Sequence, residues 1–207
     1  AAKFALLQNT DGKFFTFEEY KNVINGEQTD KDGNLIYLYA TDKTAQYSYI
    51  EAATARGYDV LLMDGQLDSH YIGMLEQKFE KSRFVRVDSD VVDNLIRKEN
   101  NREVTLTAQE RDAMTTVFKS QIPAIEKSEF MVMFEALGEN SAPVMITQSE
   151  YMRRMKEMAA VQPGMSFYGE LPDSFNLIVN TDHPLCKKVL SDTDTACNEA
   201  VAPLVSK

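Results

Sequence analysis

Two short apolar runs on either side of a helix-forming segment constrain the fold of this chain most. The first run is LIYLY at residues 35–39, and the second is VLLM at residues 60–63. Both are too short for helices and are rich in residues that favour strands. The segment between them has apolar residues at helical spacing and ends at Gly57, which can adopt the left-handed conformation of a helix end. This order predicts two parallel strands, and their continuous apolar character indicates a sheet covered on both faces.

The segments after the second run extend this unit. Residues 71–79 carry apolar side chains at helical spacing, residues 84–87 read as a third strand, and residues 91–96 read as a closing helix. Strands that alternate with helices extend one parallel sheet. We therefore expect residues 1–98 to form a three-layer α/β domain with a short, mainly parallel sheet.

Helix starts are marked by polar residues at several places. The capping-box pattern, a Ser or Thr followed three residues later by a Glu, begins at Thr16, Thr107 and Thr147. In this pattern the hydroxyl and the carboxylate each accept a hydrogen bond from a backbone N–H that the helix leaves unpaired. Thr41 or Asp42 can cap the helix between the first two strands. The sequence thus predicts helices directly after these residues.

The second half of the chain has a different pattern. Residues 97–103, which read RKENNRE, form a polar run that we interpret as a linker. Beyond it, residues 130–134 alternate as a strand, and residues 144–146 read as a strand that returns antiparallel to it. The apolar pattern of residues 175–179 predicts a last strand. We therefore expect residues 99–207 to form a second domain of the α+β class.

Charge and cysteine content limit the classes of function. The chain has 207 residues and a net charge of -10, so binding to a nucleic acid backbone would have to overcome electrostatic repulsion. No apolar run approaches the roughly 20 residues that span a bilayer. The two cysteines, Cys186 and Cys197, form no CxxC motif and no disulfide framework, which fits a reducing compartment. We expect a soluble, cytoplasmic protein that binds neither nucleic acid nor membranes.

The ends of the sequence suggest a fragment of a longer chain. Residues 1–7 look like the middle of a helix, without an initiator Met or a capping residue. Residues 195–207 stop without a helix-ending signal. We therefore expect further segments on both sides.

A row of methionines marks a candidate binding helix at residues 149–161. Met152, Met155 and Met158 follow at intervals of three, and Tyr151 lies beside them. Methionine is flexible and polarizable, which suits a surface that accepts dissimilar partners. The alternative is a buried core stripe, the more common role of apolar residues at helical spacing. Because the three methionines turn by about 60° around the helix at each step, we expect some of them to be exposed.

Asp64 offers an alternative function. It follows the second strand at its carboxyl end, where open parallel sheets bind ligands, so a flavodoxin-like small-ligand-binding or enzymatic domain stays open. No GxGxxG or GxxxxGK[ST] motif supports a phosphate-binding loop. Asp182 and His183 resemble an acid-oriented base, but no nucleophile stands at a motif spacing, so we favour a helix-capping role for His183. With only His70 and His183, the sequence predicts no zinc site.

Four segments carry a family resemblance. They are FEEY at residues 17–20, LIYLY at residues 35–39, GYDVLLMD at residues 57–64 and NTDHP at residues 180–184. Through their order and spacing, the chain from Leu6 to His183 resembles the ninety-kilodalton heat-shock chaperone family, most closely its bacterial members.

The resemblance implies a place within a larger machine. The first domain is similar to the small α/β end of the family's middle domain, and the second to its carboxyl-terminal dimerisation domain. The family is an ATP-driven homodimer that uses ATP and Mg, but its nucleotide site and its middle-domain arginine loop lie upstream of Ala1. The resemblance therefore implies no catalytic residue, no cofactor and no ATP hydrolysis in this chain. Dimerisation uses the family's last helices, and the chain stops at Lys207, where that region begins.

The resemblance also implies a site for client proteins. Family members contact unfolded or partly folded clients through an exposed amphipathic helix, which matches residues 147–161 here. The positions carried over are Tyr151, Met152, Met155 and Met158.

A second client patch is weaker. Bacterial members carry an acidic residue, a Trp and an Asn at the positions of Ser69, His70 and Gly73, and all three differ here. The sequence thus predicts a chaperone fragment with its site on the methionine helix. A ligand-binding domain near Asp64 and a purely structural connector are the alternatives.

Overall fold

The computed structural model describes residues 6–65, 68–96, 103–161 and 171–191, except the side chains of Ser69, His70, Met158, Ala160 and Val161. The chain divides into two compact units, residues 1–99 with 153–169 and residues 100–152 with 170–207. The predicted boundary after residue 98 stays a prediction, and most of the predicted linker lies outside the described ranges.

The first unit is built around parallel strands. The central strand β3 (Leu35–Ala40) lies between β4 (Val60–Leu62) and β5 (Ser82–Arg86) and pairs in parallel with both. All six residues of β3 are buried, as expected for a strand with layers on both faces. The predicted parallel pairing is confirmed.

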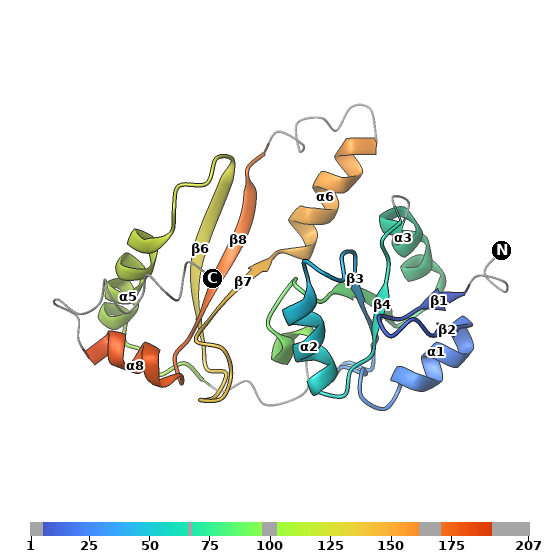
Figure 1. Cartoon of the computed structure of the whole chain (residues 1–207), viewed down its shortest axis with the longest axis horizontal. Helices are drawn as coiled ribbons and strands as arrows, with labels where there is room; N and C mark the ends of the chain where they lie inside the picture. The colour runs from blue at the N-terminus through green and yellow to red at the C-terminus, as the bar shows by residue number, and fades with distance from the viewer. Residues whose placement is uncertain (1–5, 66–67, 97–102, 162–170, 192–207) are drawn as a thin grey trace. The chain divides into compact units, whose positions relative to one another are not determined.

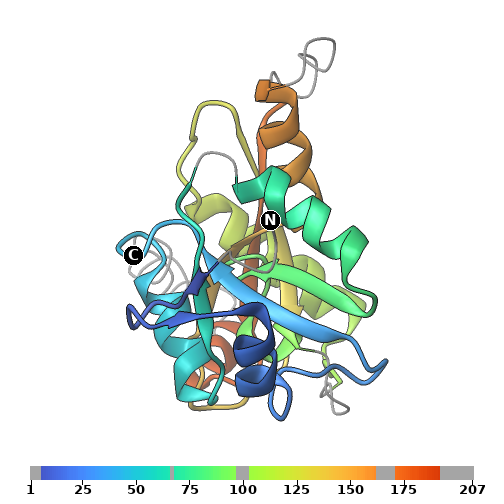
Figure 2. The same cartoon turned by 90° about the vertical axis from the view of Figure 1, so that its right-hand side faces the viewer.

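Helices cover both faces of this sheet (Figure 1). They are α1 (Phe17–Ile24), α2 (Tyr47–Ala55), α3 (Asp68–Lys78) and α4 (Val92–Leu95). Because side chains alternate along β3, Tyr37 and Tyr39 pack in one core with α1 and α3, while Ile36 and Leu38 pack in a second core with α2 and α4. Figure 2 shows α1 and α3 in front of β3. The first unit is therefore a three-layer α/β arrangement.

A small antiparallel sheet precedes α1. β1 (Leu7–Gln8) pairs with β2 (Phe14–Phe15), so the helix expected through residue 7 is wrong at Leu7; residues 1–5 lie outside the described part. Asn9 shapes the turn, because its side-chain oxygen accepts hydrogen bonds from the backbone N–H groups of Asp11 and Lys13. Such local bonds favour a turn over a helix.

Helix α2 begins later than predicted. The side-chain oxygen of Gln46 accepts hydrogen bonds from the backbone N–H groups of Thr41 and Asp42, and Gln46 itself holds the N-cap position. The carboxylate of Asp42 accepts from the N–H groups of Thr44 and Ala45 and so forms a turn ahead of the helix. The predicted cap at Thr41 or Asp42 is therefore wrong.

The second unit contains a mixed three-stranded sheet. Its elements are α5 (Ala108–Gln121), β6 (Ser128–Glu135), β7 (Val144–Gln148), β8 (Asp173–Asn180) and α8 (Pro184–Ser191). The last strand, β8, lies between the other two, parallel to β6 and antiparallel to β7. β7 therefore runs antiparallel to β6 as predicted, but the two do not pair directly as a hairpin would, because β8 lies between them. β8 carries a continuous buried run, Leu177, Ile178 and Val179, which suits the central position.

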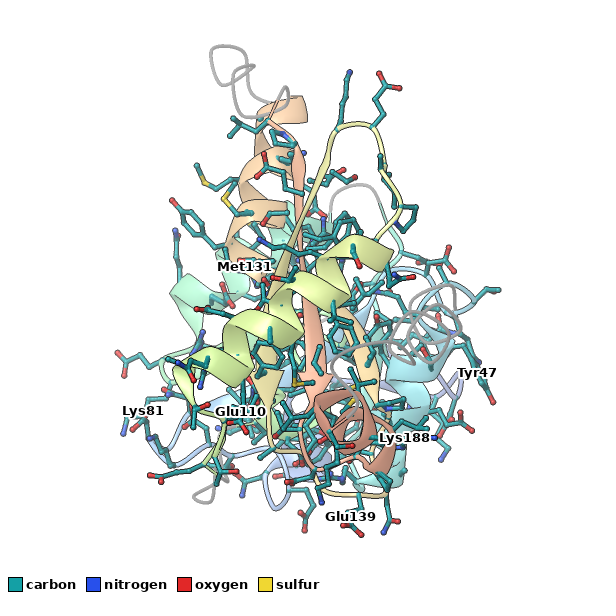
Figure 3. All side chains as sticks on the ribbon, turned by 90° about the vertical axis from the view of Figure 1, so that its left-hand side faces the viewer. Tyr47, Lys81, Glu110, Met131, Glu139 and Lys188 are labelled. Carbon is teal, nitrogen blue, oxygen red and sulfur yellow. The ribbon has the colours of Figure 1, made fainter. Side chains whose placement is uncertain are left out.

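Helices α5 and α8 cover one face of this sheet, as Figure 3 shows. Met114 and Phe118 of α5 and Cys186 and Val189 of α8 form a core with the strand residues beneath them. None of the helices in the described ranges is long and apolar enough to cross a membrane.

Two of the three predicted capping boxes are confirmed. Thr16 caps α1 and Thr107 caps α5, each with the Glu three residues later completing the box. The third is wrong, because Thr147 lies in β7 and pairs with Asn176 of β8. Its hydroxyl is buried without a hydrogen-bond partner, and the following helix starts at Glu150. Pairing with β8 therefore overrides the local capping signal.

Candidate functional site

The predicted site residues lie on α6 (Glu150–Val161). With about 100° between successive residues, Tyr151, Met155 and Met158 share an arc of about 60°, and Met152 lies about 60° beyond Met155. Tyr151 is 68% exposed. Met152 and Met155 are half-buried, and the side chain of Met158 lies outside the described residues. One side of α6 is thus apolar, with its tyrosine open to solvent.

Within the first unit, Arg153 on the opposite side of α6 binds Tyr39 of β3. Arg153 is only 5% exposed, and its Nη2 donates a hydrogen bond of 2.5 Å to the hydroxyl of Tyr39. Its guanidinium carbon lies 5.8 Å from the centre of the Tyr39 ring, and Glu157, one helical turn later, forms an ion pair with it. A buried cation needs such partners, because removing it from water without them costs several kcal/mol.

Arg154 makes a second set of contacts within the first unit. Its Nη1 lies 2.8 Å from a carboxylate oxygen of Glu76 on α3, and its Nη2 donates to the backbone oxygen of Phe84 on β5 at 2.6 Å. The other carboxylate oxygen of Glu76 accepts from the backbone N–H of Phe84 at 2.7 Å. A helix and a strand are therefore joined to α6 through one guanidinium group.

We call these five residues the arginine clasp: Arg153, Arg154, Tyr39, Glu76 and Phe84. All of them belong to the first unit. Arg153 lies about 160° around the helix from Tyr151 and Arg154 lies about 60° from it, so the contact of Arg153 is on the side away from the tyrosine. Sequence reasoning found the apolar side and missed the clasp. The available signal was Arg153 on the helix side opposite the methionine row, with Arg154 next to it in the sequence.

The weaker predicted patch lies at the start of α3. The side chains of Ser69 and His70 lie outside the described residues, so the patch stays a prediction. Gly73 is half-buried, and a Cβ atom added there would meet no atom within 4 Å. The backbone at Gly73 thus has room for a Cβ atom.

The alternative site at Asp64 lies at the end of β4. Asp64 is exposed beyond the end of β4, and the next residue, Gly65, donates its N–H to Asp68 at the start of α3 at 2.9 Å. In the ranges that the structure describes, no group of three or more His, Cys, Asp or Glu residues could hold a metal ion. Among the residues of this loop that the structure describes, no feature favours a ligand.

The other side chains that could take part in catalysis have structural roles. The Nδ1 atom of His183 accepts a hydrogen bond from the N–H of Leu185 at 3.2 Å, so the predicted capping role is confirmed. Asp182 accepts a hydrogen bond from the N–H of Gly138 at 2.9 Å. Burial raises the pKa of the Cys186 thiol to about 11, which keeps it in the unreactive protonated form.

Comparisons with known proteins agree on one family. The family model described as Hsp90 protein matches residues 3–205. Chaperone protein HtpG of Bacteroides thetaiotaomicron is 65% identical over 204 residues, which cover 99% of this chain and 30% of the relative. Chaperone protein htpG of Bacteroides fragilis is 63% identical over the same length. Chaperone protein HtpG of Porphyromonas gingivalis is 53% identical over all 207 residues. The chain spans about 30% of the length of these curated relatives.

Proposed function

The chain belongs to the Hsp90 protein family, and on that premise we propose that it is the client-binding part of a molecular chaperone. Its site is the apolar side of α6, formed by Tyr151, Met152, Met155 and Met158. The observation that carries this proposal is the two-sided use of the helix. Arg153 of the clasp holds one side, while Tyr151, about 160° around the helix from it, is 68% exposed.

The chemistry of this side suits unfolded proteins. Such chains expose apolar side chains of many shapes, and methionine adapts to them because it is unbranched and polarizable. Tyr151 adds a rigid ring with a polar tip, which binds apolar surface at a low entropic cost. Each side chain contributes at most about 1.5–3 kcal/mol when fully covered, so a client binds through several weak contacts and can leave.

The remaining properties of the protein follow from the family. We propose that the chain works within an ATP-dependent, homodimeric chaperone of the cytoplasm whose ATP and Mg site lies outside this chain. The chain itself then hydrolyses no ATP and needs no cofactor. Its partners are unfolded or partly folded proteins rather than nucleic acid or membranes, in line with its net charge of -10.

Suppression of aggregation tests this function. The site variant replaces the four residues of the apolar side of α6 with Ser. The matched control replaces Tyr47 and Met74, which are 60% and 62% exposed on helices α2 and α3. We expect the site variant to lose most of its ability to keep a denatured test protein from aggregating, while the control keeps it. Circular dichroism confirms that both are folded. If both variants suppress aggregation equally well, α6 is not the client site.

A further inference from the structure

The strand β6 lies at the border of the sheet in the second unit. Among the described residues, one of its edges pairs with β8 and no strand pairs with the other. A terminal strand presents backbone N–H and C=O groups that can pair with an added strand. β6 is eight residues long, which gives an extended segment a full partner.

The side chains of β6 divide between two faces. Val132 and Phe134 pack with the core beneath α5 and α8. Met131 and Met133 alternate with them on the other face, where they are 61% and 39% exposed (Met131 is labelled in Figure 3). An exposed apolar face on a border strand attracts other chains, and natural proteins usually avoid it. Its presence here indicates a binding role.

Acidic residues flank the two methionines on the same face. Glu129, Met131, Met133 and Glu135 follow at intervals of two, so this row reads the same from both ends. Two copies of β6 paired in register would place Glu opposite Glu in either direction, which is destabilising. A segment with apolar side chains at its centre and Lys or Arg at its ends would meet complementary groups along the whole row. The charge pattern therefore favours a basic partner over a second copy of this chain.

Resting on the proposed function, we infer that β6 is a second client-binding element. It pairs with an extended segment of an unfolded protein that is apolar at its centre and basic at its ends. Backbone hydrogen bonds supply affinity without reading a sequence, and the two methionines and flanking carboxylates select the segment. The two elements then recognise different features of a client. β6 binds its extended backbone, and α6 binds its apolar side chains.

Binding of a defined peptide tests this inference. The probe is a fluorescent peptide of about ten residues, with alternating Val and Thr at its centre and Lys at both ends, followed by fluorescence anisotropy. The same peptide with N-methyl groups on alternate residues cannot donate the backbone hydrogen bonds of an added strand. We expect the methylated peptide to bind at least about tenfold more weakly. Equal binding of both peptides would overturn the inference.

Variants of the protein locate the peptide. Replacement of Met131 and Met133 with Ser, and separately Glu129→Lys, should each weaken binding of the unmethylated peptide several-fold. The control Met74→Ser removes an equally exposed methionine from α3 and should change nothing. Both test variants alter exposed residues, and circular dichroism verifies their fold. Peptide binding that is indifferent to both would also overturn the inference.

The α6 site variant separates this inference from the proposed function. If it loses aggregation suppression while the β6 variants bind peptide like the unmodified protein, the proposed function stands and the role of β6 falls. If the β6 variants lose the peptide while the α6 variant still suppresses aggregation, β6 binds extended segments and α6 is not the client site. If neither set changes its readout, both proposals fall.

Discussion

Asn180 shows how much of the second unit depends on one side chain. It is fully buried, its Oδ1 accepts from the N–H groups of Leu137 and Asp182 at 3.1 Å, and its Nδ2 donates to the backbone oxygen of Gly138 at 2.8 Å. These bonds tie the end of β8 to the segment between β6 and β7. The hydrogen-bonding capacity of a single amide thus stabilises a connection between distant parts of the sequence.

We predict that Asn180→Ala lowers the free energy of unfolding by about 2–4 kcal/mol, because it leaves several buried backbone groups without partners. Urea denaturation measures the change. The control is Asn176→Ala on the same strand, at a half-buried position. Equal losses for the two variants would contradict the role assigned to Asn180.

The capping boxes make stability depend on pH. The backbone N–H of Thr107 donates to Glu110, as does the hydroxyl of Thr107, and these bonds lower the pKa of the carboxyl group. A group whose pKa is lower in the folded state stabilises the protein above its unfolded value of about 4.3. This contribution is lost as the pH falls through the folded pKa.

We therefore predict that Glu110→Gln lowers the melting temperature at neutral pH and that the difference disappears at acidic pH, below the folded pKa of the carboxyl group. Thermal unfolding of both proteins across this pH range measures it. A difference at Glu110 that persists at the lowest pH would have another cause.

At the scale of elements, local patterns predicted what local interactions determine. The strand, helix and strand around Gly57 were correct, because apolar periodicity and a left-handed glycine, with φ of 79°, are properties of short segments. The placement of β8 between β6 and β7 was not predicted, because it depends on partners far away in the sequence. The capping box predicted at Thr147 was wrong for the same reason, since pairing with Asn176 of β8 outweighs the local capping pattern.

The candidate site also has a part that the sequence predicted and a part that it did not. The methionine row on α6 was visible in the sequence because its spacing is helical. The clasp was not, since Arg153 and its partner Tyr39 are 114 residues apart. An arginine on the polar side of a helix usually lies in solvent, and only the folded chain distinguishes it from one that anchors the helix.

The clasp is testable as an interaction between elements. In a double-mutant cycle of Arg154→Gln and Glu76→Gln, we predict a coupling energy of about 0.5–1 kcal/mol, a modest value because both side chains keep some contact with solvent. Glu76→Gln retains an oxygen that can accept from Phe84. Hydrogen exchange of the α6 backbone should accelerate in the Arg154 variant. Unchanged exchange and additive unfolding energies would show that α6 does not depend on this contact.

At the scale of the whole molecule, a net charge of -10 coexists with exposed apolar residues on α6 and β6. Repulsion between copies limits self-association, and the same field attracts basic segments. The two surfaces should therefore differ in their response to salt, since α6 offers mainly apolar contact and β6 adds carboxylates.

We predict that added NaCl weakens binding of the lysine-flanked peptide, because raising the salt from about 0.1 M to about 1 M shortens the Debye length from about 10 Å to about 3 Å. Aggregation suppression through α6 should change much less over this range. Titrations of both at several salt concentrations measure the difference. A peptide affinity that is independent of salt would argue against the role of Glu129 and Glu135.

The most direct test of the central claim is methyl NMR of protein labelled with ¹³C at its methionine methyl groups, in the presence of an unfolded client protein. There are 10 methionines in the chain, and they include buried Met114 and exposed Met74 as internal controls. We predict that the signals of Met152, Met155 and Met158 shift or broaden when the client is added, while those of the two controls stay unchanged. Unchanged signals from all three α6 methionines, under conditions where the client is bound, would contradict the account.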